Sequence, residues 1–260
     1  MPGKIRVQRS GPLAEIVFDH PERRNAITAD MWRAIPEIAR ELDADDGVRV
    51  VLLRGAGDVA FVSGADISQF KQERTGAEAG RYEEENTTAF DALSSIGKPV
   101  LAAIHGFCIG GGCAIALTAD LRYCAEDAVF AIPAARLGLG YNAAGIATLT
   151  RIVGEPRAKE IFMTARRFDA HEAHAMGLVN GVLPKAELDA FVLKIVEQIA
   201  DNAPLTLHAA KTAFRDLARP ESERRPDEVR EAIRRCIDSH DYAEGVQAFL
   251  EKRRPEFQGR

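Results

Sequence analysis

The sequence has few cysteines and no apolar leader, and these absences exclude several classes of protein. The 4 cysteines form no CxxC pair and have no histidines at zinc-ligand spacing; they are Cys108, Cys113, Cys124 and Cys236. This pattern predicts reduced, mostly buried thiols rather than a disulfide framework or a metal site. Residues 1–10 alternate charged with apolar side chains and lack the apolar core of a signal peptide, so we expect a cytoplasmic protein.

Excess positive charge and long apolar runs are lacking as well. The formal net charge is -5 at pH 7, which predicts no nucleic-acid partner and no attraction to anionic membranes. The most apolar stretch, residues 100–117, contains His105 and several glycines and is therefore a poor membrane span. Hydrophobic residues make up 46% of the chain and charged residues 28%, as in an ordinary globular protein.

Strand and helix patterns alternate through the first two thirds of the chain. Apolar residues at helical spacing run from Met31 to Leu42, and the cap residue Thr28 precedes them, which predicts an amphipathic helix. Strands are predicted at residues 5–8, 13–18, 50–53 and 99–104, and residues 50–53 form a continuous apolar run. The first two of these segments flank a Ser-Gly-Pro turn and predict a hairpin. This succession favours an α/β fold.

The last third of the chain has helical periodicity. Asp169 and Glu172 have the spacing of a capping box, and the apolar residues of 188–199 fall on one helical face. Prolines punctuate the chain after that point, at Pro204, Pro220 and Pro226. We therefore expect a core over residues 1–200 followed by a helical region over residues 201–260.

Two glycine-centred turns are the candidate chemistry of the chain. Gly110-Gly111-Gly112 follows a predicted strand and opens a predicted helix, which places unpaired N–H groups at the positive end of a helix dipole. Close backbone packing explains such a triplet equally well. No Gly-Lys-Ser/Thr follows, so a Walker phosphate loop is excluded. The second turn, residues 61–66, could supply another N–H, and two such donors aimed at one point would form an oxyanion hole.

These turns and several further motifs resemble the signature of the enoyl-CoA hydratase/isomerase (crotonase) superfamily, and the resemblance covers nearly the whole chain. The motifs that carry it are Asn25-Ala26, Phe61-Val62-Ser63-Gly64-Ala65-Asp66-Ile67, Lys98-Pro99-Val100, His105-Gly106, Gly110-Gly111-Gly112-Cys113, Leu137-Gly138, Gly177-Leu178-Val179 and Glu244 to Arg253. The resemblance implies an α/β spiral of ββα units with a C-terminal helical region that drives formation of a homotrimer or a dimer of trimers. It implies an acyl-CoA substrate and no separate cofactor, since coenzyme A is part of that substrate.

The resemblance also assigns residues to the site. It implies that the backbone N–H groups of Ala65 and Gly111 hold the thioester oxygen. It places Arg24 near the coenzyme A phosphates or pantetheine, and Ser63 and Asp66 at the adenine pocket.

Two further residues are assigned to a neighbouring subunit's coenzyme A. The resemblance implies that Phe249 and Lys252 reach across to it from the C-terminal region. A solvated helix charge is the alternative interpretation of Lys252.

The departures from the family pattern concern the catalytic glutamates. Hydratases of this family carry one glutamate two residues after the glycine triplet and another after a proline some twenty residues later, where this chain has Ala114 and Ala134. A positioned acid or base usually contributes about 10²- to 10⁴-fold to a rate. Hydration by the usual mechanism is therefore disfavoured.

The segment from Pro133 to Asn142 resembles the methylmalonyl-CoA and ethylmalonyl-CoA decarboxylases of the superfamily. The resemblance implies that Tyr141 faces the substrate carboxylate and that Asn142 orients a water or a carbonyl. A core ring with a satisfied hydroxyl is the alternative interpretation of Tyr141. Ala65 departs from this branch, which carries a histidine there.

Other functions stay open at this point. A decarboxylase needs no general base, because departing carbon dioxide leaves an enolate that the two amides can hold. A 2-enoyl-CoA hydratase that recruits a substitute acid, such as Glu84 or Asp91, is one alternative. A catalytically silent acyl-CoA-binding protein is the other.

Overall fold

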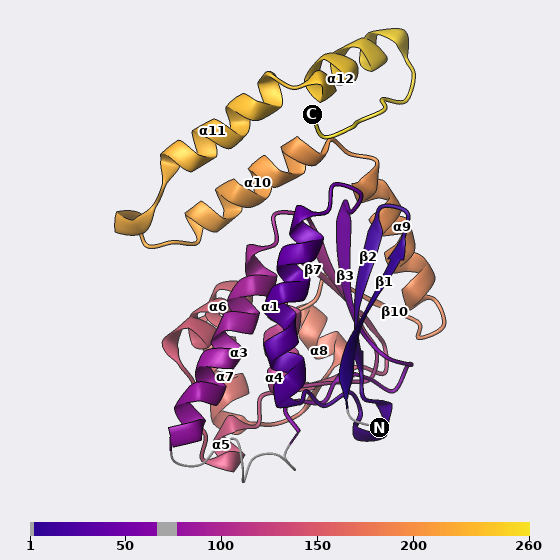
Figure 1. The fold of residues 1–260 in the computed structure, drawn as a ribbon. Helices are drawn as coiled ribbons and strands as arrows, with labels where there is room; N and C mark the ends of the chain where they lie inside the picture. The colour runs from indigo at the N-terminus through magenta and orange to yellow at the C-terminus, as the bar shows by residue number, and fades with distance from the viewer. Residues whose placement is uncertain (1–2, 67–76) are drawn as a thin grey trace.

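The computed structural model describes residues 3–66 and 77–260 (Figure 1). Within them, a 6-stranded sheet has the order β1-β2-β3-β5-β7-β10 and a 4-stranded sheet the order β4-β6-β8-β9. The larger sheet consists of β1 (Lys4–Ser10), β2 (Leu13–Asp19), β3 (Val50–Gly55), β5 (Val100–Ile104), β7 (Leu121–Ala125) and β10 (Gly181–Leu183). The smaller sheet consists of β4 (Ala60–Val62), β6 (Phe107–Ile109), β8 (Val129–Ala131) and β9 (Phe168–Asp169).

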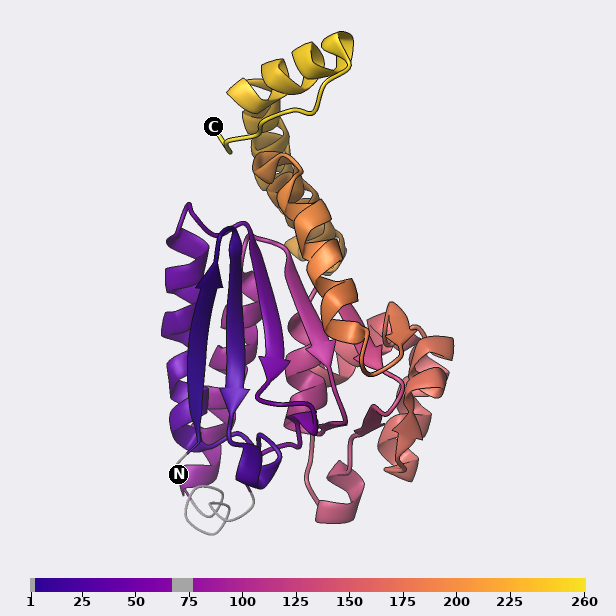
Figure 2. The same cartoon turned by 90° about the vertical axis from the view of Figure 1, so that its right-hand side faces the viewer.

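Helices cover one face of the larger sheet and, on the other face, the part formed by β3, β5 and β7 (Figures 1 and 2). The core helices are α1 (Ala29–Ala44), α3 (Ala77–Ser95), α4 (Gly111–Thr118), α5 (Ala134–Leu137), α6 (Ala143–Val153), α7 (Glu155–Thr164), α8 (Ala170–Ala175) and α9 (Leu188–Ala200). The C-terminal helices are α10 (Pro204–Leu217), α11 (Pro226–Ile237) and α12 (His240–Glu251).

The chain advances by a repeated strand–strand–helix unit. β3 lies in the larger sheet and β4 in the smaller one before the chain enters α3, and β5, β6 and α4 repeat that order. β3, β5 and β7 pair in parallel, which requires a crossover connection between successive strands. The α/β spiral of ββα units expected from the resemblance is therefore confirmed.

The hairpin and the first helix form as their local patterns predict. β1 and β2 pair antiparallel across their full length, from Lys4 opposite Asp19 to Ser10 opposite Leu13. Thr28 caps α1, because its hydroxyl oxygen accepts a hydrogen bond of 3.3 Å from the Met31 N–H. Both predictions are confirmed.

The central strands divide their side chains between two cores. Val51 and Leu53 pack into the main core, which lies against α1, α3 and α4. Val50 and Leu52 point to the other face, where α9 covers them. Because both faces are covered, β3 reads as a continuous apolar run rather than an alternating one.

Gly112 allows α4 to sit directly on β4. A Cβ atom on this residue would lie 2.1 Å from the backbone oxygen of Val62. We expect Gly112→Ala to lower the free energy of unfolding by about 2 to 3 kcal/mol, since the backbone must move to admit the methyl group. Chemical denaturation measures the change. Gly140→Ala is the control, because a Cβ at Gly140 would meet nothing within 4 Å; an equal loss in both variants would contradict the packing argument.

The C-terminal helices form a layer beyond one end of the core, with α10 beside α11 (Figures 1 and 2). Lys211 anchors α10 to the core. Its ammonium group donates to the backbone oxygen of Lys98 at 2.7 Å and to Asp120 at 2.6 Å, and its side chain is buried. Arg215 adds a hydrogen bond to the backbone oxygen of Ile96. The helical C-terminal region expected from the sequence is present, while its division from the core at residue 200 stays a prediction.

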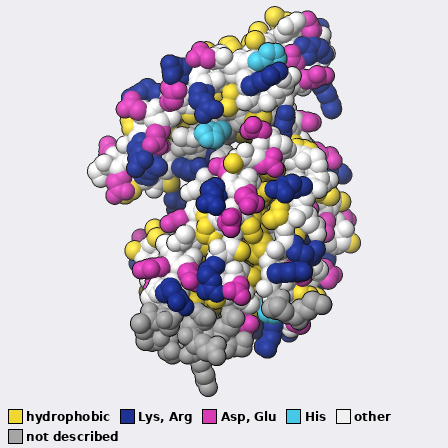
Figure 3. Space-filling model, in the orientation of Figure 1, with side chains coloured by type: hydrophobic (Ala, Val, Ile, Leu, Met, Phe, Trp, Pro, Cys, Tyr) yellow, Lys and Arg dark blue, Asp and Glu magenta, His cyan; other side chains and the backbone are white. Residues whose placement is uncertain are grey.

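The surface carries charges of both signs. Lys and Arg side chains alternate with Asp and Glu side chains over the face drawn in Figure 3. In the described parts of the chain, no helix has the length and apolar character that a membrane crossing requires.

Candidate active site

In the turn after β4, the amide N–H of Ala65 faces away from Ile27, the residue that pairs with this turn. Ile27 pairs with this turn as an isolated parallel bridge: its N–H donates to the Gly64 oxygen, and its oxygen accepts from the Asp66 N–H, both at 2.8 Å. Ile27 bonds to the Gly64 oxygen and the Asp66 N–H, which lie on one edge of the turn. The Ala65 N–H between them therefore points to the opposite edge, away from Ile27. No acceptor within residues 3–66 and 77–260 is bonded to it.

Gly64 is required by the shape of this turn. Its φ is +108°, and a Cβ there would also lie 3.2 Å from the Ile109 oxygen. Glycine is favoured here for two reasons: it adopts this positive φ without strain, and it has no side chain to clash with Ile109.

The second amide comes from the start of α4. Gly110 has a φ of 55° and ψ of -111°, and its N–H donates to the Ala131 oxygen at 2.8 Å. Gly111 is the first helical residue, so its N–H has no partner within the helix. The positive end of the helix dipole adds to the attraction for negative charge at this point.

The two turns meet. A Cβ on Gly111 would lie 3.9 Å from the Ala65 nitrogen, although the two residues are far apart in sequence. The glycine triplet thus forms the strand-to-helix junction that the sequence predicts, beside the second glycine-centred turn. This arrangement can hold an oxyanion with two main-chain donors.

Trp32 lies directly beneath the Gly111 turn. Its side chain is 1% exposed, and its Cζ2 atom would be 3.4 Å from a Cβ on Gly111. The indole N–H donates to the hydroxyl of Tyr82 at 3.0 Å, and Phe90 packs edge-on against the ring at a centroid distance of 5.2 Å. Sequence reasoning missed these residues, since only the fold brings α1 and α3 to the glycine turn.

The positions of the missing glutamates lie around the same triplet. Ala114 is in the first turn of α4, where its N–H donates to the Gly110 oxygen at 3.1 Å. Ala134 is buried at the start of α5, directly after Pro133, whose Cδ would be 3.9 Å from a Cβ on Gly110. Neither alanine can hold a water or transfer a proton.

The acids considered as substitutes lie on α3. Glu84 and Asp91 are exposed. Glu85 is half-buried, but its carboxylate pairs with Arg33 at 3.3 Å and with Arg81 at 3.8 Å. A role for Glu84 or Asp91 as a substitute acid stays a prediction.

Tyr141 and Asn142 immediately precede α6. Tyr141 is half-buried, and its ring packs edge-on against Phe162 of α7 at a centroid distance of 5.0 Å. Asn142 is exposed and caps α6, because its Oδ1 accepts a hydrogen bond of 2.9 Å from the Gly145 N–H. The side-chain oxygen of Asn142 is thus committed to the helix, and a role in orienting substrate is left to its amide nitrogen.

The residues assigned to coenzyme A divide into two groups. Arg24, Ser63 and Asp66 lie together: the Ser63 N–H donates to the Arg24 oxygen at 3.1 Å, and Asp66 belongs to the turn that carries Ala65. The Ser63 hydroxyl donates to the Arg23 oxygen at 3.0 Å. The sequence also allows a helix to begin at Asp66, but residues 67–76 lie outside the described part of the chain.

The guanidinium group of Arg24 lies over the ring of Phe107, 4.6 Å from its centroid. Arg167 approaches the same ring at 5.9 Å. Arg24 has the left-handed φ of 52°, and Asn25 holds this turn by donating to the Ala56 and Ala60 oxygens at 3.0 and 2.7 Å. The edge beside Ala65 therefore carries two cationic side chains, of which Arg167 was not predicted.

Phe249 and Lys252 lie far from the amides within one chain. Both are exposed at the end of α12, in the C-terminal layer (Figure 1). Phe249 is 83% exposed and borders an apolar hollow of about 440 Å³ with Leu205, Tyr242 and Phe257. The contact with a neighbouring subunit's coenzyme A that the resemblance implies for these two residues stays a prediction.

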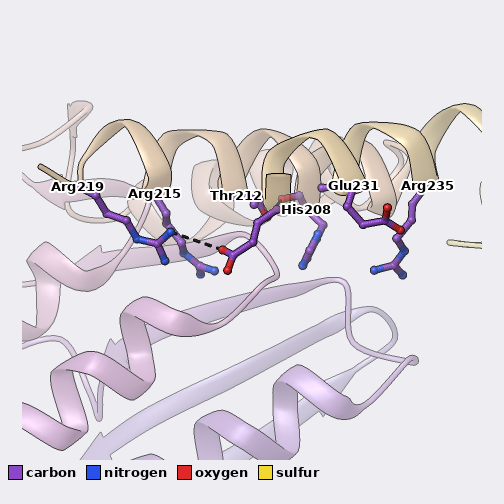
Figure 4. Close-up of a pocket in the computed structure, with 8 residues that line it drawn as sticks. His208, Thr212, Arg215, Arg219, Glu231 and Arg235 are labelled. Carbon is purple, nitrogen blue, oxygen red and sulfur yellow. Dashed lines mark hydrogen bonds and ion pairs between the residues drawn. The ribbon is translucent and has the colours of Figure 1, made fainter. Parts of the chain in front are cut away.

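A polar cavity of about 330 Å³ lies between α10 and α11, away from α4 (Figure 4). His208, Arg215 and Arg235 line it, and burial together with the charge of these arginines lowers the pKa of His208. Two acids of the lining are already paired with arginines: Glu228 with Arg219 and Arg225, and Glu231 with Arg234. This cavity is separate from the paired amides.

The cysteine next to the glycine triplet has a packing role. Cys113 is buried, and its thiol donates to the Cys108 oxygen at 2.8 Å. Burial raises the pKa of Cys108 well above its usual value and that of Cys124 to about 12. The expected burial of the thiols is confirmed for Cys108, Cys113 and Cys124.

His105 is likewise structural. It is 6% exposed, and its Nε2 lies 3.0 Å from Asp189 on α9. The hydrogen bond with His105 and the charge of Arg54 lower the pKa of Asp189, and these two contacts tie α9 to the sheet.

The chain forms a spiral of ββα units that brings together two main-chain amides, one in a turn and one at the N-terminus of a helix. This arrangement is typical of the crotonase class of fold. The model of the enoyl-CoA hydratase/isomerase family matches residues 8–260, and the chain belongs to this family. It is therefore an enzyme that acts on acyl-CoA thioesters.

Named relatives span the whole chain. A short-chain-enoyl-CoA hydratase of Clostridium acetobutylicum is 33% identical over 252 residues, which are 97% of this chain and 96% of the relative. A carnitinyl-CoA dehydratase of Salmonella typhi is 32% identical over 265 residues, with all of both chains covered. A crystal structure described as an enoyl-CoA hydratase/carnithine racemase from Magnetospirillum magneticum superimposes with a TM-score of 0.93 at 35% identity, covering 98% of this chain and 96% of the other. These names include no decarboxylase, so the resemblance to that branch stays a prediction.

Proposed function

We propose that the protein is an acyl-CoA lyase that stabilises a thioester enolate between the amides of Ala65 and Gly111, with decarboxylation as its reaction. The observation that carries this proposal is the alanine at both glutamate positions, Ala114 and Ala134, beside an otherwise complete pair of main-chain donors. A site with donors for an oxyanion but without the two glutamates of the family suits a reaction that needs only the donors.

In the proposed reaction the thioester oxygen accepts hydrogen bonds from both amides. The bond between the α-carbon and the carboxylate breaks, carbon dioxide leaves, and the electron pair moves through the α-carbon to the thioester oxygen. The amides hold the enolate, and water then donates a proton to the α-carbon in place of the lost carboxylate and leaves as hydroxide. The donors act mainly where charge develops, so they lower the barrier more than they strengthen ground-state binding.

The remaining residues bind the substrate. Tyr141 orients the departing carboxylate, while Arg24, Ser63 and Asp66 hold coenzyme A along the edge beside Ala65. Coenzyme A is part of the substrate, and the proposed step requires no separate cofactor. We propose that the reaction takes place in the cytoplasm.

We propose that the active form is a homotrimer or a dimer of trimers, in which Phe249 and Lys252 reach a neighbour's coenzyme A. Apolar side chains exposed on the C-terminal helices support this assembly: Phe214 is 73%, Leu217 64% and Leu250 75% exposed. Patches of this kind are typical of contact surfaces between subunits.

Hydration is the second candidate, and the names of the relatives favour it. It would require Glu84 or Asp91 to act as the acid, or water to be held by other groups. A catalytically silent acyl-CoA-binding protein is the candidate from another class.

Incubation with methylmalonyl-CoA and, separately, with crotonyl-CoA distinguishes the candidates. Release of carbon dioxide from the first supports the proposal. Hydration of the second, seen as loss of the enoyl absorbance, supports a hydratase instead. Binding of both without turnover indicates a binding protein.

Tyr141→Phe tests the role of the hydroxyl. A hydrogen bond to a charged group contributes about 1.5 to 3 kcal/mol, so we expect kcat/KM to fall roughly 10- to 100-fold. Steady-state rates of carbon dioxide release measure the change. Tyr123→Phe is the matched control, since Tyr123 of β7 packs edge-on against Phe191 of α9, in the core on the other face of the sheet. An unchanged rate in Tyr141→Phe removes the residue from the mechanism.

A further inference from the structure

The pair of Trp32 and Tyr82 borders the oxyanion site without belonging to either amide turn. Trp32 comes from α1 and Tyr82 from α3, 50 residues further along the chain. The indole lies against Gly111 with its Cζ2 atom 3.4 Å from where a Cβ would be, and the Ala65 nitrogen is 3.9 Å from that same point. Trp32 therefore forms a buried wall against which the Gly111 turn packs, beside the Ala65 nitrogen.

The hydrogen bond to Tyr82 fixes the orientation of this wall. Trp32 is 1% exposed and Tyr82 is 5% exposed, so water cannot replace either partner. A buried indole N–H needs an acceptor, and the Tyr82 hydroxyl at 3.0 Å supplies it. Rotation of the indole about its side-chain torsions would break this bond.

Phe90 holds a second edge of the same ring. It lies two helical turns after Tyr82 on α3, and its ring meets the indole edge-on at 5.2 Å. The polar contact and the aromatic contact together clamp the indole between α3 and the Gly111 turn.

We propose that Tyr82 is a positioning residue of this enzyme: through Trp32 it sets the separation and direction of the Ala65 and Gly111 N–H groups. This inference rests on the proposed enolate site but not on which bond the enzyme breaks. Misplacing a donor by a fraction of an ångström weakens a hydrogen bond to an oxyanion more than contacts to the rest of the ligand.

Acetoacetyl-CoA is a probe of donor geometry that does not depend on turnover. Its β-keto thioester ionises to an enolate with a near-ultraviolet absorbance, and an oxyanion site lowers the apparent pKa of the bound compound. In Tyr82→Phe we expect that apparent pKa to rise by about one unit, which is a tenfold loss of preference for the enolate. The dissociation constant of butyryl-CoA, which offers only a neutral thioester, is expected to change less than about twofold.

The matched control is Tyr123→Phe, which removes the same hydroxyl from a ring in the other core. In a Trp32→Phe background, which has no indole N–H, Tyr82→Phe is expected to have no further effect on the enolate pKa, since partners in one interaction are not additive. An enolate pKa unchanged by Tyr82→Phe, or an equal shift in both backgrounds, overturns the proposal even if the melting temperature falls. Failure of the unmodified protein to bind any acyl-CoA would instead reject the proposed function.

Discussion

Replacing Gly111 with proline is expected to lower kcat/KM for the acyl-CoA substrate roughly 10²- to 10³-fold below that of Gly111→Ala. Proline has no N–H, and losing one donor of an oxyanion hole typically has this effect. Gly111 is the first residue of α4, the helical position that best tolerates proline. Steady-state kinetics with the substrate identified by the incubation test give the ratio.

Gly111→Ala isolates the donor from the added carbon atoms. Both substitutions place a Cβ at the same point, 3.4 Å from Trp32, but alanine keeps its N–H. Circular dichroism and a melting curve establish that both variants fold. Equal rates in the two variants would show that the Gly111 N–H does not stabilise negative charge on the substrate in the transition state. The proposed oxyanion site would then be wrong.

The parts of the fold that sequence predicts are those with short-range causes. The capping box at α8 forms as its spacing indicates: Asp169 accepts from the Glu172 N–H at 2.8 Å, and the Glu172 carboxylate accepts from the Asp169 N–H at 3.2 Å. The same holds for the hairpin and for the Thr28 cap. Each depends on residues close together in the chain.

The smaller sheet was not predicted. β4, β6 and β8 have 3 residues each, too few to display a period. Their pairing is also non-local, as between Val129 of β8 and Asp169 of β9. Only the three-dimensional path of the spiral brings these segments together.

The candidate site divides in the same way. The glycine turns could be located because a strand, a turn and a helix follow one another in sequence. The contact of Trp32 with Tyr82 could not, since no local pattern marks it. Asn142 carried a capping signal three residues before Gly145, and the structure shows that the signal describes the main use of its side-chain oxygen.

Restoring both glutamates is expected to convert the protein toward hydration. We expect Ala114→Glu with Ala134→Glu to raise the rate of crotonyl-CoA hydration by at least about 100-fold, because each positioned acid or base contributes about 10²- to 10⁴-fold. Both positions border the glycine triplet, so the new carboxylates would lie beside the amides that we propose hold the thioester. Loss of the enoyl absorbance measures the rate.

The control moves the second glutamate from residue 134 to the adjacent residue 135. Ala114→Glu with Ala135→Glu has the same net charge, but residue 135 is exposed whereas Ala134 is 6% exposed. Burial at residue 134 favours the protonated form of a glutamate, which is the form that acts as an acid. The control variant lacks one of the two positioned groups and is therefore expected to hydrate crotonyl-CoA at least about 100-fold more slowly than the variant with glutamates at residues 114 and 134. Fast hydration by the unmodified protein would contradict the proposal directly, because it would mean that a different acid already does the work assigned to the missing pair.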